Sequence, residues 1–278
     1  MQVFERKAEL NRFVEQIKAD GKSIGFVPTM GALHAGHIAL VIEAKKQCDK
    51  VVASVFVNPI QFNNAEDLKK YPRTFESDRK LLEEVGCDVV FFPSVEEMYP
   101  EEEIEESYDF GSLETVMEGA ARPGHFNGVA IVVKRLFDLV QPDKAFFGKK
   151  DFQQLAIIRA LVKQMVSPIQ IVGIDTVREN DGLAMSSRNR RLSVAQREVA
   201  VELSQALNFI KQNKNKMLPG ELEKEAIGKL TKNFKVEYVQ IVNGYTLQPI
   251  TDWNQTNYAV ACAAAFLGDV RLIDNLEL

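Results

Sequence analysis

The fold of this chain is decided by the stretch Val27-Pro28-Thr29-Met30-Gly31-Ala32-Leu33-His34-Ala35-Gly36-His37. It follows an apolar run, residues 24–27, that is typical of a buried strand, and it leads into Ile38-Ala39-Leu40-Val41-Ile42, which is typical of the start of a helix. A strand, a tight glycine-bearing turn and a helix are the usual means by which an α/β sheet brings a nucleotide phosphate to a helix N-terminus. The stretch therefore predicts a phosphate-binding turn.

Two histidines stand in this turn in place of a glycine fingerprint. Residues three apart share a helix face, so His34 and His37 can point at one ligand, and Gly36 leaves room for a phosphate to approach the backbone. An imidazole can donate hydrogen bonds to phosphoryl oxygens. The same residues could instead be surface histidines, a helix cap or half of a metal site, although zinc needs three or four ligands and the third histidine is the distant His125. The motif alone leaves these alternatives open.

Composition narrows the class of protein. The 278 residues, 46% hydrophobic and 26% charged, are typical of a soluble globular enzyme with one large or two unequal domains. The net charge of −5 argues against a nonspecific binder of nucleic acid, which usually carries a positive excess.

The cysteines and the apolar runs predict the compartment. Cys48, Cys87 and Cys262 are far apart and odd in number, which favours free thiols in a cytosolic protein. The N-terminus lacks the apolar core of a signal peptide, and no run of about 18 apolar residues is present to span a membrane. We therefore expect a cytoplasmic protein that binds neither nucleic acid nor membranes.

Alternating strand-like and helix-like segments fill the first part of the chain. Such alternation predicts right-handed crossovers and an α/β fold with a doubly wound, Rossmann-like parallel sheet over residues 1–175. Asp151 is expected to cap the last helix. The predicted strands are residues 24–27, 51–57, 89–92, 143–147 and 169–174, and the predicted helices are residues 5–20, 75–85, 129–140 and 152–166.

The composition changes after residue 175. A polar, cationic loop over residues 177–191 precedes two helical stretches, residues 194–211 and 221–233, and three strand-like runs, residues 236–242, 258–266 and 270–273. This pattern predicts a smaller α+β domain over residues 176–278. An acidic segment, residues 94–107, is expected to be a solvated surface excursion.

Four polar or glycine-bearing loops follow predicted parallel strands: the histidine turn, residues 58–62, residues 148–151 and the cationic loop. Ligands of open parallel sheets bind at that edge. Lys149 and Lys150 suit a phosphate, although an exposed pair at a helix start is an equal alternative. Ser186, Ser187 and Arg188 suit triphosphate oxygens, with a flexible interdomain loop as the alternative.

Seven stretches carry a family resemblance. The His34-Ala35-Gly36-His37 turn resembles the HxGH signature of class I synthetase-like nucleotidyltransferases, and Met185-Ser186-Ser187-Arg188 resembles their second phosphate motif. More specifically, the chain resembles the pantothenate synthetase (pantoate–β-alanine ligase) family. The matching stretches are residues 28–34, 57–62, 71–74, 122–126, 146–154, 181–189 and 271–275.

The resemblance implies a two-step reaction: pantoate attacks ATP to give pantoyl adenylate and pyrophosphate, and β-alanine then displaces AMP to give pantothenate. It implies catalytic roles for His37 (as proton donor), His34, Lys150 and Arg188, and pantoate contacts by Gln61 and Gln154, with Pro28, Thr29 and Asn58 alongside. Mg²⁺ would arrive with ATP, the C-terminal domain would act as a lid, and the chain would form a homodimer. The implied ATP-binding residues are Met30, Gly31, Ala32, Leu33, His34, Ala35, Gly36, His37, Gly148, Lys149, Lys150, Asp151, Val177, Met185, Ser186, Ser187 and Arg188.

Three other functions use some of the same residues. An HxGH nucleotidyltransferase that adenylylates a small phosphorylated metabolite would share the histidine turn, but it fits the pair Gln61 and Gln154 less well. A class I aminoacyl-tRNA synthetase is disfavoured by the short, acidic chain. A silent nucleotide-binding module would be favoured by loss of His37 or Lys150, and both are present.

Overall fold

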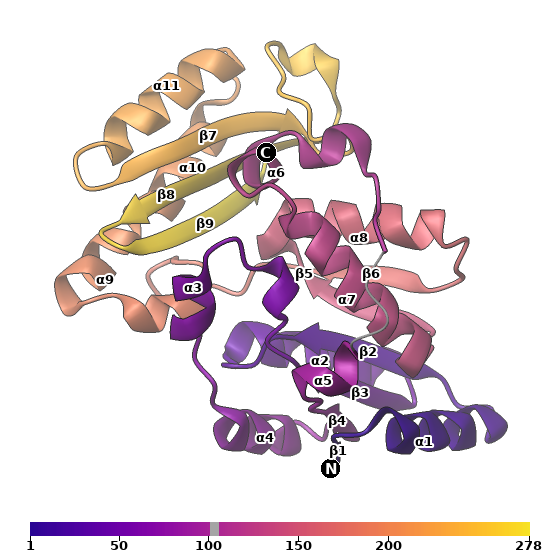
Figure 1. The fold of residues 1–278 in the computed structure, drawn as a ribbon. Coiled ribbons are helices and arrows are strands. Elements are labelled where there is room, and N and C mark those ends of the chain that lie inside the picture. The colour runs from indigo at the N-terminus through magenta and orange to yellow at the C-terminus, as the bar shows by residue number, and fades with distance from the viewer. Residues whose placement is uncertain (101–105) are drawn as a thin grey trace. The chain divides into compact units, whose positions relative to one another are not determined.

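The computed structural model describes residues 1–100 and 106–278, which form two compact units (Figure 1). The first unit comprises Met1–Phe110, Arg122–Lys149 and Gln154–Asp175. The second unit comprises Gly111–Ala121, Lys150–Gln153 and Thr176–Leu278. Two short segments that precede residue 176 therefore belong to the second unit.

A six-stranded parallel sheet forms the centre of the first unit. Its strands run in the order β1 (Gln2–Phe4), β4 (Val89–Phe91), β3 (Lys50–Val55), β2 (Ile24–Thr29), β5 (Lys144–Gly148) and β6 (Gln170–Ile174). From β2 the chain progresses through β3 and β4 on one side and through β5 and β6 on the other. The strand order therefore reverses between β2 and β5, and ligands of such sheets bind outside the carboxyl ends at this point. The predicted α/β, doubly wound parallel sheet is confirmed.

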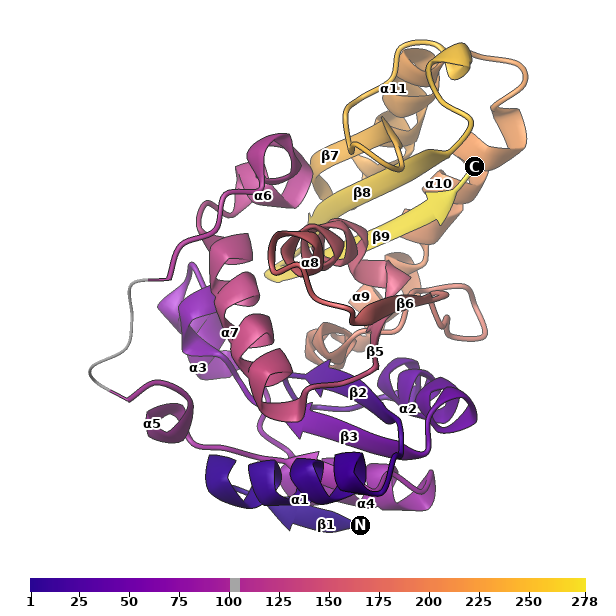
Figure 2. The same cartoon turned by 90° about the vertical axis from the view of Figure 1, so that its right-hand side faces the viewer.

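Helices cover both faces of this sheet. Helices α2 (Ala35–Gln47) and α4 (Phe75–Glu84) pack on the face to which Val27 contributes. The neighbouring residue Phe26 points to the opposite face, where its ring packs edge-on against Phe137 of α7 (His125–Val140). Helix α1 (Lys7–Ala19) packs beside α7, and Figure 2 shows both on the side toward the viewer. Because β2 is buried on both faces, its sequence reads as a continuous apolar run.

Four further α-helices lie between β3 and β6 in the described part of the chain. They are α3 (Ala65–Lys70), α5 (Val95–Met98), α6 (Met117–Ala121) and α8 (Phe152–Gln164). Within the described ranges, no helix has the length and the apolar character needed to cross a membrane.

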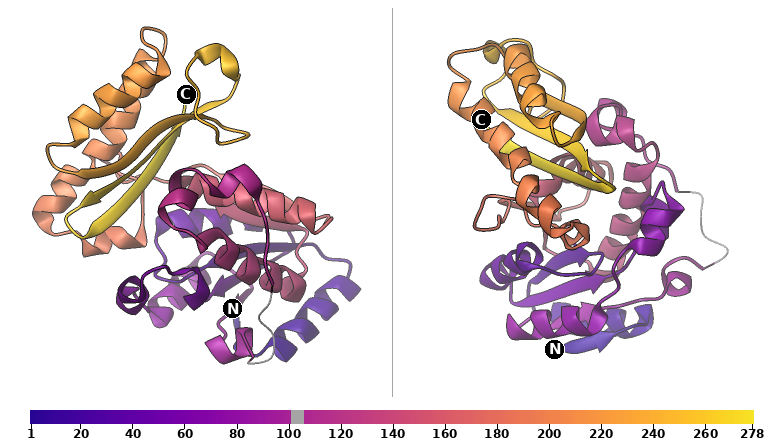
Figure 3. Two further views of the ribbon diagram at one scale, coloured as in Figure 1. Left: turned by 45° about the horizontal axis from the view of Figure 1, so that its top comes forward. Right: turned by 90° about the vertical axis from the view of Figure 1, so that its left-hand side faces the viewer.

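A three-stranded antiparallel sheet forms the centre of the second unit. Its order is β7 (Lys235–Asn243), β8 (Ala259–Leu267) and β9 (Val270–Glu277). Ala261, Ala263 and Ala265 of β8 are buried against apolar side chains of α10 (Glu202–Asn213) and α11 (Pro219–Leu230). Figure 3 shows these two helices, in orange, along one face of the sheet. Small side chains on the middle strand leave room for the helices to approach closely, which gives the predicted smaller α+β architecture.

Several predicted element bounds were wrong. The helix predicted from Val129 begins at His125, so part of the expected loop is the first turn of α7. The predicted strand over residues 51–57 ends at Val55, and residues 59–61 form the 3-10 turn η1 (Pro59–Gln61). The predicted helix over residues 194–211 is divided into α9 (Val194–Ala200) and α10. Asp151, expected as a helix cap, closes the 3-10 turn η3 (Lys149–Asp151) and directly precedes α8, which begins at Phe152, so its capping role stays a prediction.

The acidic segment was expected to be a solvated excursion, and that expectation was partly wrong. Residues 95–98 form α5, and Met98 and Tyr99 are buried. Glu97 accepts hydrogen bonds from the Arg6 side chain and the Lys7 backbone amide. Residues 101–105, which hold four of its glutamates, lie outside the described residues. The three cysteines are free, as predicted, and all three are buried.

Candidate active site

The histidine turn leaves β2 in the first unit through two residues of positive φ. Gly31 has φ 80° and Ala32 has φ 50°. At Gly31 an added Cβ would lie 3.0 Å from a carboxylate oxygen of Asp78, so glycine serves both the backbone angle and the close approach. Asp78, a buried residue of α4, accepts hydrogen bonds from the amides of Ala32 (2.9 Å) and Leu33 (2.8 Å). A buried carboxylate therefore fixes the shape of the turn.

The two histidines cap the start of α2. The Gly36 amide donates to His34 Nδ1 at 3.2 Å, and the His34 amide donates to His37 Nδ1 at 3.4 Å. A ring nitrogen that accepts a hydrogen bond carries no proton, so the proton of each neutral imidazole is assigned to Nε2. The helix-cap interpretation and the phosphate interpretation are compatible, because the cap uses Nδ1 while Nε2–H can donate to a ligand.

Gln61 lies at the end of η1, close to the histidine turn. Its Nε2 lies 2.9 Å from the sulfur of Met30, and its Oε1 accepts a hydrogen bond from Asn58 Nδ2 at 3.0 Å. Asn58 is in turn held by the hydroxyl of Tyr99, which donates to Asn58 Oδ1 at 2.7 Å. The Gln61 amide is thereby oriented as a donor toward Met30. Burial raises the pKa of Tyr99, so its hydroxyl stays protonated and can donate.

His125 and Gly128 of α7 also contact η1. His125 Nδ1 lies 2.7 Å from the carbonyl oxygen of Gln61, and Arg122 lies 3.1 Å from His125 Nε2. At Gly128 an added Cβ would lie 2.5 Å from the carbonyl oxygen of Ile60. The backbone of Gln61 is thus fixed by the first turn of α7.

The carboxyl end of β5 carries two of the predicted residues of the first unit, Gly148 and Lys149. Lys149 forms an ion pair with Asp175 at 2.7 Å, while Gln154 follows in α8. Since β5 is the direct neighbour of β2, these residues and the histidine turn follow adjacent carboxyl ends at the point where the strand order reverses.

The second unit holds the other predicted phosphate residues. The side chain of Lys150 is 17% exposed, and its Nζ lies 3.7 Å from Asp151. The backbone carbonyl of Lys150 accepts a hydrogen bond from Asn275 Nδ2 at 2.7 Å. The phosphate element that includes Lys150 is therefore attached to strand β9.

The cationic loop is also held by β9. Val177 and Met185 are joined by a backbone hydrogen bond of 3.0 Å, and the Ser186 side chain accepts from the Arg188 amide at the start of η4 (Ser187–Arg191). Arg178 forms two hydrogen bonds with the buried carboxylate of Asp274, at 2.7 and 3.0 Å. The base of the loop is therefore fixed by a bidentate ion pair.

Within each unit, the structure brings predicted residues together. Met30, His34, His37, Asn58 and Gln61 gather at the carboxyl ends of β2 and β3 in the first unit. Sequence reasoning gave no role to Asp78, Tyr99 and Asn275, which contact predicted residues, or to Arg178 and Asp274, which fix the base of the cationic loop. Asp274 and Asn275 lie in a stretch that carries the family resemblance, but only long-range contacts reveal what they hold.

Comparisons with known proteins decide the family. The family model described as pantoate-beta-alanine ligase matches residues 2–277. The chain belongs to the pantoate–β-alanine ligase family. The resemblance inferred from the sequence, and with it the ligase activity, is confirmed.

Relatives and solved structures of this family match this chain over nearly their full length. The pantothenate synthetase of Bacteroides fragilis is 50% identical over 279 residues, which is 100% of this chain and 99% of that protein. The crystal structure of pantothenate synthetase from Thermus thermophilus has a TM-score of 0.94 at 45% identity, covering 99% of both chains. That of the ligase from Francisella tularensis, complexed with beta-gamma ATP and β-alanine, has a TM-score of 0.84 at 32% identity and covers 99% of this chain and 97% of that one.

Proposed function

We propose that the chain condenses pantoate with β-alanine at the expense of ATP. A carboxylate oxygen of pantoate attacks the α-phosphorus, the bond from that phosphorus to the bridging oxygen breaks, and pyrophosphate leaves. The nitrogen of β-alanine, in its unprotonated form, then attacks the acyl carbonyl, and the bond to AMP breaks. Two lines of support combine: the chain belongs to this ligase family, and its two Nε2–H imidazoles follow β2 where the strand order reverses.

The histidines are proposed to bind the triphosphate. As pyrophosphate leaves, negative charge grows on the phosphoryl oxygens, and preorganised donors stabilise that charge more than they stabilise bound ATP. His34 and His37 meet this need through Nε2–H. Since a neutral imidazole does not give up this proton, His37 is proposed to donate a hydrogen bond to the leaving group rather than a proton. Met30, Gly31, Ala32, Leu33, Ala35 and Gly36 are proposed to line the nucleotide, together with Gly148 and Lys149.

Gln61 and Gln154 are proposed to hold pantoate, with Pro28, Thr29 and Asn58 alongside. The orientation of the Gln61 amide supports this role, because Asn58 occupies its oxygen and its nitrogen remains on the side of Met30. An amide donor suits the carboxylate and hydroxyl oxygens of pantoate. Positioning the acceptor in line with the α-phosphorus supplies much of the catalysis of such a transfer.

In the second unit, Lys150 and Arg188 are proposed to neutralise phosphate charge. Asp151, Val177, Met185, Ser186 and Ser187 complete the proposed ATP-binding set. A guanidinium fork and a lysine ammonium suit phosphate oxygens because both are cationic hydrogen-bond donors. We further propose that residues 176–278 act as a lid that excludes water from the acyl adenylate. Identical limited-proteolysis patterns with and without ATP and pantoate would contradict the lid.

Three finer features belong to the same proposal. Mg²⁺ is proposed to enter as its ATP complex, held through phosphate oxygens, because this small ion keeps several of its waters. No group of three or more His, Cys, Asp or Glu side chains in the described residues is placed to hold a metal ion. A homodimer and a cytoplasmic location are proposed from the family resemblance and the sequence.

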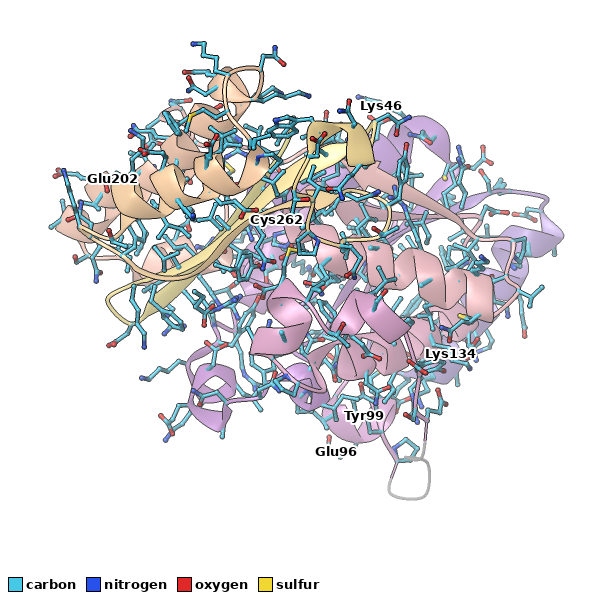
Figure 4. The ribbon with its side chains drawn as sticks, turned by 90° about the horizontal axis from the view of Figure 1, so that it is seen from above. Lys46, Glu96, Tyr99, Lys134, Glu202 and Cys262 are labelled. Carbon is cyan, nitrogen blue, oxygen red and sulfur yellow. The ribbon has the colours of Figure 1, made fainter. Side chains whose placement is uncertain are left out.

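The decisive experiment measures pyrophosphate and AMP release from ATP, Mg²⁺ and pantoate, with and without β-alanine. We expect pyrophosphate release to require pantoate, and AMP release to require β-alanine as well. His37→Ala should lower both by about 100- to 1,000-fold, while Lys46→Ala, an exposed change on the same helix (labelled in Figure 4), should lower neither. If the wild type binds ATP but releases no pyrophosphate with pantoate, the acceptor is another metabolite or the chain is a silent nucleotide-binding module.

A further inference from the structure

We propose that Asp274 and Asn275 are positioning residues that set the spacing between the two phosphate-binding elements of the second unit. These elements are the Lys150 segment and the loop that carries Arg188. The inference rests on the proposed function, which gives both elements their phosphate role. Neither Asp274 nor Asn275 is itself proposed to touch a substrate.

Asp274 holds the loop. The residue is 3% exposed, and its carboxylate receives both terminal nitrogens of Arg178, at 2.7 and 3.0 Å. Arg178 also donates to the carbonyl oxygens of Gly182 (3.0 Å) and Asn275 (3.2 Å). Arg178 and Ala184 form a β-bridge, so one guanidinium joins both sides of the base of the loop to β9. Residues 185–188 follow directly from this fixed base.

Asn275 holds the Lys150 segment. The residue is buried at 7% exposure, and its Nδ2 donates to the Lys150 carbonyl oxygen at 2.7 Å. That carbonyl lies within the short turn η3, between β5 and α8. A hydrogen bond to the backbone fixes the position from which the Lys150 side chain extends, without using the ammonium group that a phosphate needs.

Both contacts come from consecutive residues of one strand. Side chains of consecutive strand residues point to opposite faces, so β9 can hold two elements that lie on different sides of it. Asp274 and Asn275 pair with Ala263 and Cys262 of the middle strand β8, on which Figure 4 labels Cys262. Because β9 pairs with β8 along its length and holds both elements, this one strand sets the distance between the two phosphate elements.

This arrangement predicts a specific kinetic effect. Gln61 and Gln154, the proposed pantoate residues, belong to the first unit. Substitutions that remove the contacts of Asp274 or Asn275 should therefore weaken ATP binding and slow adenylation while leaving the KM for pantoate unchanged. Misplacement of binding groups by about 1 Å can cost about 100-fold, so a 10- to 100-fold loss in kcat/KM for ATP is about the range expected.

The test uses Asp274→Asn and Asn275→Ala in the full chain, with Glu118→Gln as the matched control. Glu118 of α6 is also buried and forms a bidentate pair with Arg271 of β9, at 2.6 and 2.8 Å, so its change removes the same kind of charge from the same unit. The measurements are the Kd for α,β-methylene-ATP, KM and kcat with each substrate, and the unfolding temperature. Arg178→Lys, which keeps the charge but loses the fork, provides a milder variant if Asp274→Asn fails to fold.

We expect all of these substitutions to lower the unfolding temperature, but only those at Asp274, Asn275 and Arg178 to raise the Kd for the ATP analogue. The inference is overturned if Glu118→Gln raises that Kd equally, if none of the variants changes it, or if the KM for pantoate rises in step. The analogue binds without reacting, so this result is separate from the proposed function. A wild type that binds the analogue but releases no pyrophosphate with pantoate contradicts the function and leaves the positioning test intact.

Discussion

The ring centroids of His34 and His37 lie 4.1 Å apart, and both rings turn Nδ1 toward backbone amides at the start of the same helix. The cap thereby fixes the tautomer of each ring as well as its direction. A neutral histidine held in this way is a hydrogen-bond donor through Nε2. The same contacts that begin α2 thus prepare two donors of defined direction.

This tautomer assignment predicts a graded response at His37. The amide nitrogen of glutamine can occupy the place of Nε2, whereas that of asparagine can only approach the place of Nδ1. We expect His37→Ala and His37→Asn to lower kcat for pyrophosphate release by about 100- to 1,000-fold, the usual loss of one transition-state donor. His37→Gln should retain clearly more activity than His37→Asn in the same assay. Equal activities would show that the Nε2 position is not the one that matters.

The sequence was sufficient to predict most of the main sheet because its central strands, such as β2 and β3, are largely buried. The apolar runs of β2 and β3 need no knowledge of their partners, and the order of strands and helices predicts the topology. Strand β1 was missed because Gln2–Phe4 is short and is defined by pairing with β4, far away in the chain. The start of α7 was missed because Pro123 and Gly124 are residues typical of a loop.

The candidate site was predictable only where motifs are local. His34, His37 and the loop around Arg188 are recognisable from neighbouring residues. Asp78 and Tyr99 are not, because their partners at Leu33 and Asn58 lie 45 and 41 positions away. The membership of Gly111–Ala121 in the second unit depends on contacts such as Arg271 with Glu118, 153 positions apart. No pattern of composition or periodicity carries that information.

Asp78 supports the histidine turn, and its substitution should affect activity. Asp78→Asn keeps the size of the side chain but replaces one acceptor oxygen with a donor, which faces an amide of Ala32 or Leu33. We expect pyrophosphate release to fall at least about 10-fold, because small displacements of catalytic groups are costly. Asp88→Asn is the matched control: Asp88 accepts from the Val51 amide near the start of β3, away from the turn, and its change should leave kcat unaltered.

Asp88 should instead contribute stability that depends on pH. Its burial alone would raise the pKa of the carboxyl, but hydrogen bonds from Lys45, Lys50 and the Val51 amide outweigh that effect and lower the pKa below its usual value. A lowered folded-state pKa stabilises the protein above the unfolded pKa, and this stabilisation is lost as the pH falls through the folded value. Asp88→Asn should therefore lower stability by about 1 kcal/mol at neutral pH, given the partial exposure of these pairs.

The difference between wild type and Asp88→Asn should then shrink as the solution is acidified. Thermal unfolding measured from neutral pH to below about pH 3 checks this, because an aspartate ordinarily titrates near pH 3.9. A difference that stays constant across this range would mean that the ionised carboxylate is not the source of the stability.

Tyr99 should affect the binding of pantoate through its contact with Asn58, which in turn orients Gln61. Tyr99→Phe removes the donor to Asn58 Oδ1 and leaves a buried acceptor without that bond, so the Asn58 and Gln61 amides lose part of their orientation. We expect the KM for pantoate to rise several-fold while the Kd for an ATP analogue stays the same. Tyr108→Phe, which removes a hydroxyl that donates to Glu106, is the control and should change neither value. An equal rise in both constants would assign Tyr99 a general structural role.

The absence of a side chain at Gly128 lets α7 pack closely against η1, and this contact should help to position Gln61. A Cβ there would lie 2.5 Å from the carbonyl oxygen and 2.8 Å from the carbonyl carbon of Ile60, both backbone atoms that cannot rotate away. Gly128→Ala must therefore separate α7 from η1, which also carries the backbone of Gln61. We expect a loss of stability of about 1–3 kcal/mol, as for other overpacked sites, together with a higher KM for pantoate.

Gly228 provides the opposite case in the same experiment. It lies within α11, and an added Cβ would meet nothing within 4 Å, so Gly228→Ala gains helix propensity without a clash. We expect it to raise stability by about 0.5–1 kcal/mol and to leave all kinetic constants unchanged. Denaturant unfolding of the two variants should thus give changes of opposite sign for the same chemical substitution. If Gly128→Ala were as stable as the wild type, η1 and α7 would not be in the close contact on which the orientation of Gln61 depends.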